Sequence, residues 1–178
     1  MRPPRKLLLI FSEVFANGGL QRFNRTLLAA SEGLDIHCDV YSLNDAQAPA
    51  TVSNISLTVF NQAKPKFAQA VFRAVRGGEY AAVIIGHVNF VELVAFALRC
   101  RVFKRPAALL ITHGVDVWSG IEGMRRRAMR AVDTILCVSH YTKSMIQRQA
   151  PELTDERFAI FPNALNALWT QEIGRAHV

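Results

Sequence analysis

The chain has 178 residues, of which 51% are hydrophobic, 20% charged and 9% aromatic. This length corresponds to one domain, and a composition this apolar excludes an intrinsically disordered chain. The formal net charge is +7, and the excess lies in residues 61–130, which hold twelve basic and four acidic side chains. A local positive field favours an anionic partner or an anionic membrane surface, and a well-solvated basic surface is the alternative explanation.

The three cysteines, Cys38, Cys100 and Cys137, are far apart and show no metal-ligand spacing. This disfavours a disulfide framework and a zinc module, and it predicts a reducing, cytoplasmic location. The apolar run at residues 7–11 is too short for a signal peptide. The segment 80–100 is long enough to cross a bilayer, but polar residues interrupt it. We therefore expect a soluble protein, or one bound peripherally at the inner face of the membrane.

Short apolar runs alternate with segments of helical period along the chain. Strands are predicted at 7–11, 37–42, 55–60, 81–85, 107–112, 134–138 and 158–161, and helices after Gly19, at 64–76, 90–101 and 124–130, and from 140 to a stop before Pro151. Continuous apolar strands between helices imply a mostly parallel sheet with helices on both faces, which is the doubly wound, Rossmann-like α/β fold. Ligands bind beyond the carboxyl ends of the strands in such sheets.

The loop after the first predicted strand contains a candidate anion site. Gly18 and Gly19 stand just before a helix, where bare backbone can approach a ligand and free N–H groups meet the positive helix end. Arg22 adds a charge on the first turn. The loop has neither GxGxxG nor a GK[ST] ending, which disfavours dinucleotide binding and ATP hydrolysis. A tight strand-to-helix turn would also explain the two glycines.

Two histidines each follow a predicted strand directly. His87 comes after 81–85 and His113 after 107–112, so they converge on one edge if those strands are neighbours. His113 is the stronger candidate, because Gly114 leaves room beside it and Asp116 could orient or charge it. A purely structural role is the alternative for either ring.

Two basic segments and one tryptophan have ordinary explanations. The run Arg125–Arg127 lacks the interleaved aromatic residues of a nucleic-acid module, so no nucleic-acid partner is expected. The amphipathic pattern of 64–76 fits an anionic membrane surface, but it also fits a surface helix on a sheet. Trp118 could stack on a sugar or a lipid, and a place in the core is the more ordinary expectation.

Four motifs occur in order along almost the whole chain. They are Asn17-Gly18-Gly19-Leu20-Gln21-Arg22, Thr112-His113-Gly114-Val115-Asp116-Val117-Trp118, Ala131-Val132-Asp133-Thr134-Ile135-Leu136-Cys137-Val138-Ser139 and Ile160-Phe161-Pro162-Asn163. This combination resembles the amino-terminal half of the retaining glycosyltransferases of family 4, which have the two-domain GT-B architecture. The resemblance implies a Rossmann-like acceptor-side domain at 1–165, followed at 166–178 by the start of a linker and a non-native tail. Ala164 replaces the usual glycine of the last motif.

The resemblance also implies roles for individual residues. Gly18, Gly19 and Arg22 would bind the donor diphosphate, and His113 would act as the catalytic residue at the donor sugar. The acceptor side would be lined by Glu13, His87 and Asp116. The family usually works without a metal, the sequence has no DxD motif, and we expect no metal site and no cofactor beyond the nucleotide-sugar co-substrate.

The expected function is transfer of a hexose from a nucleotide-sugar to a saccharide or a lipid-linked acceptor. The carboxyl-terminal donor-binding domain is not in this sequence, so we expect a fragment that is inactive alone. Two alternatives remain open at this point. One is a non-catalytic anion- or nucleotide-binding α/β module, and the other is a fragment of a sugar-nucleotide epimerase of the same architecture.

Overall fold

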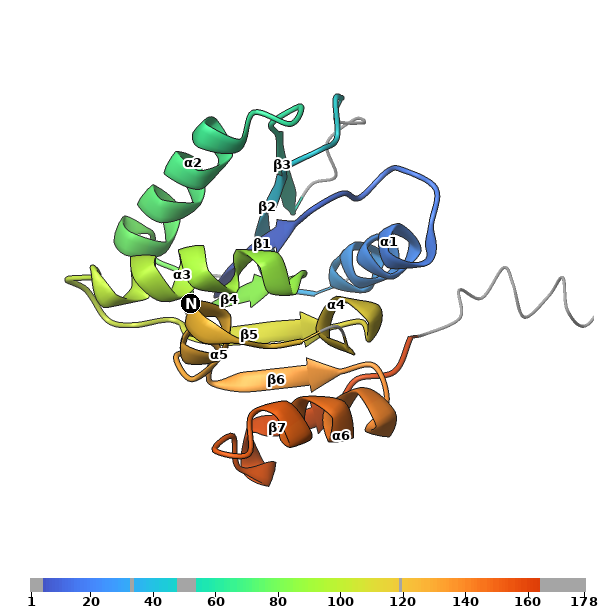
Figure 1. The fold of residues 1–178 in the computed structure, drawn as a ribbon. Helices are drawn as coiled ribbons and strands as arrows, with labels where there is room; N and C mark the ends of the chain where they lie inside the picture. Colours follow the sequence, from blue (N-terminus) through green and yellow to red (C-terminus); the bar gives the residue numbers. More distant parts are fainter. Residues whose placement is uncertain (1–4, 33, 48–53, 119, 164–178) are drawn as a thin grey trace, which may run out of the picture.

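The computed structural model describes residues 5–32, 34–47, 54–118 and 120–163, and Figure 1 shows their arrangement. Seven strands form one sheet in which every neighbouring pair is parallel, as the sequence predicts. They are β1 (Arg5–Phe11), β2 (Ile36–Ser42), β3 (Ile55–Val59), β4 (Ala82–Ile85), β5 (Ala107–Thr112), β6 (Thr134–Cys137) and β7 (Phe158–Ile160). The last expected domain segment, 166–178, and Ala164 lie outside the described residues.

Helices lie between successive strands except between β2 and β3, where the described residues contain none. The helices are α1 (Gly19–Ser31), α2 (Lys64–Gly77), α3 (Val91–Arg99), α4 (Val115–Trp118), α5 (Gly123–Met129) and α6 (His140–Gln149), with short 3-10 turns η1 (Val88–Phe90) and η2 (Asp155–Arg157). As expected, Ser139 begins α6, because its hydroxyl accepts a hydrogen bond of 3.1 Å from the Thr142 N–H. The single turn α4 was not predicted. None of the helices in the described ranges has the length and apolarity needed to cross a membrane.

The strand order is β3-β2-β1-β4-β5-β6-β7, so the order reverses between β1 and β4. The register pairs Phe11 with Ser42, and Ile10 with Ile85, so β1, β2 and β4 end close together. All carboxyl ends lie at one edge of the sheet, which we call the carboxyl edge. Loops that are far apart in the sequence meet there, and the amino ends of the strands form the opposite edge.

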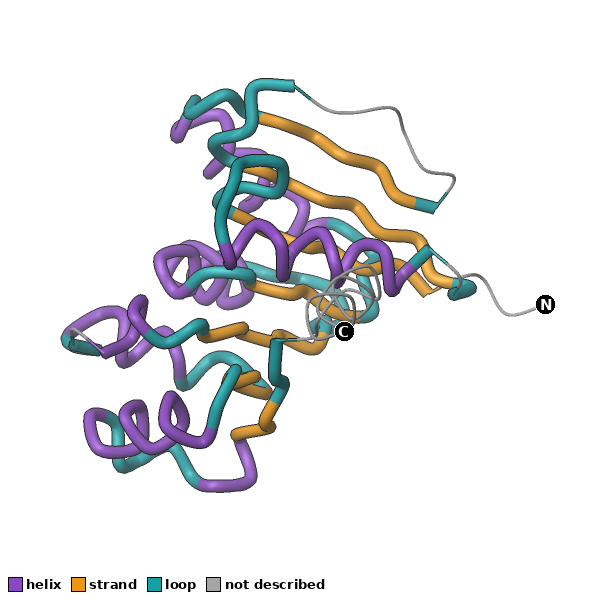
Figure 2. Tube along the Cα trace, turned by 90° about the vertical axis from the view of Figure 1, so that its right-hand side faces the viewer, coloured by secondary structure: helices purple, strands orange, loops and turns teal. Residues whose placement is uncertain are grey.

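Apolar side chains alternate between the two faces of the sheet. On β1, Leu8 and Ile10 belong to a large core with buried side chains of α2, α3, α5 and α6, whereas Leu9 and Phe11 belong to a smaller core with Leu28 of α1. Figures 1 and 2 show α1 across the sheet from α2 and α3. The predicted doubly wound α/β fold is therefore confirmed.

The two basic helices have structural explanations. The apolar face of α2, with Phe67, Val71 and Val75, is buried against the sheet, so its amphipathic pattern reflects packing. Arg126 on α5 and Arg130 at its C-cap both bind the Glu152 carboxylate. The expected place of Trp118 in the core is wrong: its side chain is 43% exposed and packs edge-on against Tyr141, with ring centroids 5.4 Å apart.

Candidate functional site

The loop after β1 is anchored by a carboxylate that follows β2. The side chain of Asp45 is buried and accepts hydrogen bonds from the N–H groups of Val14 (2.7 Å) and Phe15 (3.2 Å) and from the Ser42 hydroxyl (2.6 Å). Bonds to a carboxylate are stronger than neutral ones, so this loop has a defined shape. No local sequence pattern marks Asp45 as an anchor, because its loop partners are 30 and 31 residues away.

Helix α1 holds the same loop from the other side. The fully buried Asn24 donates to the Glu13 carbonyl at 2.7 Å, and Arg25 donates to the carbonyls of Val14 and Ala16 at 2.8 and 3.1 Å. Both side chains lie one turn beyond the start of the helix. The position of α1 relative to β1 is therefore fixed by polar contacts as well as by its apolar face.

The glycine pair opens α1 at the carboxyl edge. Gly18 is the N-cap and Gly19 the first helical residue, so the N–H groups of Gly19, Leu20 and Gln21 have no partner inside the helix. A Cβ at Gly18 would lie 2.2 Å from Oε1 of Gln21, whereas a Cβ at Gly19 would meet no atom within 4 Å. The chain's own packing therefore does not require Gly19. The two glycines are exposed, as is Arg22 on the same turn.

Glu13 and His87 line one open cavity of about 710 Å³ at the carboxyl edge, which we call the rim cavity. The Glu13 carboxylate accepts hydrogen bonds from Gln21 (2.8 Å) and Asn44 (3.1 Å), so it connects α1 to the loop after β2. His87 Nδ1 accepts a hydrogen bond of 3.2 Å from the Asn89 N–H, which leaves the proton of the neutral ring on Nε2. The negatively charged Glu13 carboxylate and the neutral His87 imidazole therefore line the same space.

The wall of the rim cavity formed by the β3–α2 connection is conformationally unusual. Asn61 and Gln62 adopt φ values of 44° and 63°, in the left-handed region that non-glycine residues seldom occupy. Backbone hydrogen bonds hold them there, from Asn61 N–H to the Asp45 carbonyl (3.1 Å) and from Gln62 N–H to the Leu43 carbonyl (2.7 Å). Gln62 and Lys64 both line the cavity. Such strain is common at ligand sites, and no local sequence signal predicts it here.

His113 directly follows β5 in the sequence, and its ring packs against α1. Its ring contacts Phe23 edge-on with centroids 5.0 Å apart, and Phe23 contacts Phe161 after β7 in the same way at 5.6 Å. A hydrogen bond to the Gly86 backbone engages one ring nitrogen, whereas the buried Nε2 has no partner among the described residues. With the proton on Nδ1, Nε2 is an acceptor for a hydroxyl group of a ligand.

Asp116 supports this histidine through the backbone. Its Oδ1 accepts a hydrogen bond of 3.0 Å from the His113 N–H, whereas Oδ2 is buried without a partner among the described residues. Asp116 therefore fixes the loop rather than pairing with the ring directly. The expected free space at Gly114 is also wrong, because a Cβ there would lie 2.8 Å from the Trp118 ring.

Burial lowers the pKa values of His87 and His113 below their ordinary value, and the Asp116 carboxylate only partly opposes this effect. Both imidazoles are therefore neutral at pH 7. Burial also raises the thiol pKa values of Cys38 and Cys137, so neither is an activated nucleophile. Nowhere in the described ranges do three side chains of the His, Cys, Asp and Glu types gather closely enough to hold a metal ion.

Replacing Asp45 by asparagine tests the anchoring of the loop. We expect Asp45→Asn to lower the free energy of unfolding by about 2 kcal/mol, because asparagine places an NH2 group where one of the two carboxylate oxygens now accepts, so that at least one buried backbone N–H loses its acceptor. Urea denaturation measures the change. Asp35→Asn, at an exposed position, is the control and should stay within about 0.5 kcal/mol of the wild type. Equal stabilities of the two variants would contradict the anchoring role.

The lowered histidine pKa values predict a pH dependence of stability. Below about pH 6.5 the unfolded chain takes up protons on His87 and His113 while the folded chain does not, so stability falls as the pH decreases through this window. His113→Gln removes one of these groups. Urea denaturation at pH 7.5 and pH 5 should show a smaller acid-induced loss for this variant than for the wild type. An unchanged or larger loss would contradict the burial of a neutral ring.

Comparisons with known proteins identify the family and the fold of the chain. The Glycosyltransferase Family 4 model matches residues 17–167. No curated protein sequence matches the chain closely enough to count as a relative. Two similar solved structures are the lipopolysaccharide outer core galactosyltransferase WaaB in its apo form and an α-glucosyltransferase in complex with UDP and a 13-mer DNA containing an HMU base.

The likeness to these structures is in the fold. The galactosyltransferase has a TM-score of 0.61 at 15% identity over 90% of this chain and 46% of its own. The α-glucosyltransferase has a TM-score of 0.59 at 11% identity over 94% of this chain and 44% of its own. This chain therefore spans less than half the length of either. Because the family model covers most of the sequence, the chain belongs to glycosyltransferase family 4 and has the Rossmann-like fold of GT-B enzymes.

Proposed function

We propose that this chain is the acceptor-side domain of a retaining glycosyltransferase that moves a hexose from a nucleotide-sugar to a saccharide or lipid-linked acceptor. The observation that carries the proposal is the open start of α1, a helix that also contacts the His113 ring, whose buried Nε2 has no partner among the described residues. Gly18, as the N-cap, leaves the first backbone N–H groups of α1 open, and Gly19 leaves free space in front of its own backbone. Phe23, on the same helix, contacts the His113 ring. A diphosphate and its attached sugar fit this pair of features.

The proposed chemistry is mainly electrostatic. Negative charge builds on the diphosphate as the bond to the anomeric carbon breaks, and donors placed in advance stabilise it. The first-turn N–H groups of α1, at the positive end of the helix, supply such donors, and Arg22 lies on the same turn. The α-glucosyltransferase structure with UDP supports a uridine nucleotide as the first ligand to test. We propose that no metal or other cofactor takes part.

In this proposal His113 contacts the donor sugar. A neutral ring accepts a hydrogen bond from a hydroxyl through Nε2, and the lowered pKa keeps the ring in that form. The acceptor occupies the rim cavity, where Glu13, Asn44 and His87 offer polar groups and Lys64 a cation. Asp116 supports the site indirectly, because its carboxylate accepts a hydrogen bond from the His113 N–H.

The remaining parts of the proposal concern partners and location. We propose that the donor domain of the full-length protein closes the other side of the site and that this chain alone does not turn over. The three free cysteines fit a reducing cytoplasm. A nucleic-acid acceptor is not proposed, because Arg126 and Arg130 are paired with Glu152, and Arg125 lies 3.3 Å from Glu92.

Gly19→Ala tests the proposed diphosphate site. The new methyl group meets no protein atom, so stability should stay the same or rise by up to about 1 kcal/mol at this helical position. The same methyl group stands in front of the free N–H groups, and we expect UDP to bind about tenfold more weakly. Thermal unfolding and ligand-observed NMR measure the two effects.

Gly77→Ala is the matched control, because it also adds a methyl group in open space, but at the far end of α2. It should bind UDP as the wild type does. If Gly19→Ala binds UDP as tightly as Gly77→Ala, the diphosphate site is elsewhere. UDP binding without sugar transfer by the complete gene product would instead favour a non-catalytic nucleotide-binding module.

A further inference from the structure

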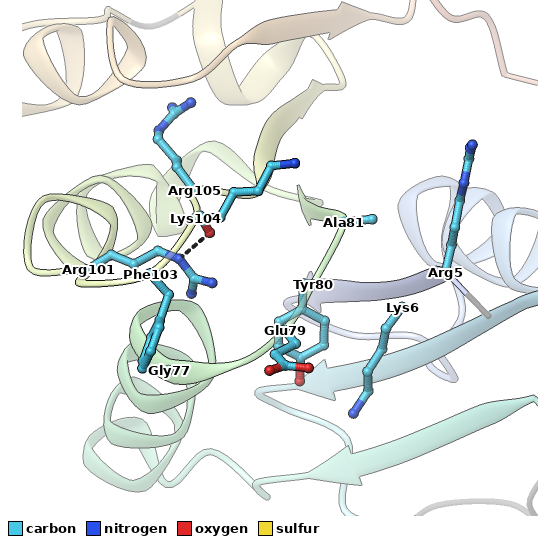
Figure 3. A pocket seen from close by; sticks show the side chains of 10 residues that line it. All are labelled: Arg5, Lys6, Gly77, Glu79, Tyr80, Ala81, Arg101, Phe103, Lys104 and Arg105. Carbon is cyan, nitrogen blue, oxygen red and sulfur yellow. Dashed lines mark hydrogen bonds between the residues drawn. The ribbon is translucent and has the colours of Figure 1, made fainter. Parts of the chain in front are cut away.

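A second cavity, of about 650 Å³, opens at the amino edge of the sheet, opposite the rim cavity. We call it the basal cavity, and Figure 3 shows its lining. Its charged residues are Arg5, Lys6, Glu79, Arg101, Lys104 and Arg105. They come from the start of β1, the segment between α2 and β4, and the loop between α3 and β5. Five cations and one carboxylate therefore surround this space.

Only part of this positive charge is neutralised by the protein. Lys6 lies 2.8 Å from the Asp39 carboxylate and Arg105 lies 2.7 Å from that of Asp133. Arg5 and Lys104 form no ion pair with a carboxylate of the described residues, and both are exposed. The cavity with its neighbouring carboxylates thus keeps an excess of positive charge, which attracts anions.

The loop at residues 100–105 carries exposed apolar side chains at this cavity, and Phe103 is one of its lining residues. Val102 is 77% exposed and Phe103 is 68% exposed. Farther back on α3, Phe96 is 59% exposed and stacks on Phe72, with centroids 5.6 Å apart. Large apolar side chains next to unpaired cations are typical of surfaces that bind membranes or partners.

Two arginines hold this loop in place. Arg101 donates to the carbonyls of Lys104 and Gly78, both at 2.8 Å, and also to the carbonyl of Val75. Arg105 donates to both oxygens of Asp133 at 2.7 and 2.8 Å. Figure 3 shows Arg101 bonded to Lys104, with Phe103 beside it. Because both ends of the segment are fixed, Val102 and Phe103 between them stay exposed.

We infer that this surface docks on an anionic phospholipid bilayer. Val102 and Phe103 enter the boundary between head groups and acyl chains, while Arg5 and Lys104 meet the lipid phosphates at the mouth of the basal cavity. The buried apolar face of α2 excludes that helix as the inserted element. In this orientation the rim cavity faces away from the bilayer, since the two edges are opposite, which suits a saccharide acceptor in solution and not an acceptor held in the same bilayer. The inference does not rest on the proposed glycosyl transfer.

Vesicle sedimentation of the full chain tests this inference. The wild type should sediment with vesicles that contain phosphatidylglycerol, stay in solution with pure phosphatidylcholine, and be released by salt. Val102→Ser/Phe103→Ser should lower the partition coefficient about tenfold through lost insertion. Arg5→Gln/Lys104→Gln should lower it at least about tenfold through lost attraction to the phosphates. All four positions are exposed, and circular dichroism verifies the fold of each variant.

The matched control is Lys66→Gln/Arg148→Gln, which removes two exposed cations, one on α2 and one on α6, that line neither the rim cavity nor the basal cavity. It should sediment like the wild type, and an equal loss would contradict the assigned surface. The inference is also wrong if the wild type stays in solution with phosphatidylglycerol vesicles at low salt. Binding of inorganic phosphate that Arg5→Gln/Lys104→Gln abolishes, without any vesicle binding, would overturn it in favour of a site for free phosphate.

Quenching by brominated lipid gives a second, independent measurement. Phe103→Trp adds a third indole to the two tryptophans of the chain, and the fluorescence that it adds over the wild type should be quenched by brominated acyl chains in anionic vesicles. An unquenched indole in a sedimenting sample would show that the loop does not insert, which contradicts the inference.

Discussion

The parallel direction of all seven strands is the constraint on which the rest of the structure depends. It places every strand end at one edge, and the reversal of strand order between β1 and β4 brings loops from separate parts of the sequence together there. Glu13 and His87, which line one cavity, and His113, which interacts electrostatically with His87, are brought to this edge only by this topology. Because β1, β4 and β5 are buried in the core, the geometry of the edge is as stable as the sheet itself.

Hydrogen bonds between polar side chains and the backbone then fix the positions of the loops at the carboxyl edge. Asp45 and Asn24 hold the loop after β1 from two sides, and Asp116 holds the loop after β5. These groups bind backbone atoms, so they fix where the glycine pair and His113 lie without occupying the open space. Packing within the chain does not require a glycine at position 19, because a Cβ there would meet no other atom. Space for a ligand is therefore the simplest explanation for Gly19.

Much of the fold could be predicted from the sequence, because the periodicity of apolar residues and the capping of helices depend on residues that are close together in the sequence. The seven strands, the Ser139 cap and the buried face of α2 follow from residues within a few positions of one another. Contacts across the sequence could not be predicted in this way. Asp45, the left-handed Asn61 and Gln62, and the pairing of Arg126 with Glu152 depend on partners brought close by the tertiary structure. The glycine pair and the histidines were found because strand ends are identifiable in a sequence.

The central claim is that the opening of α1 binds a diphosphate. Backbone amide NMR of the chain, titrated with UDP, tests it most directly. The account predicts that the largest shifts occur at Gly19, Leu20 and Gln21, together with a change in the His113 ring signals. Shifts confined to the basal cavity around Arg5 and Lys104, or no saturable shift at the start of α1, would contradict it.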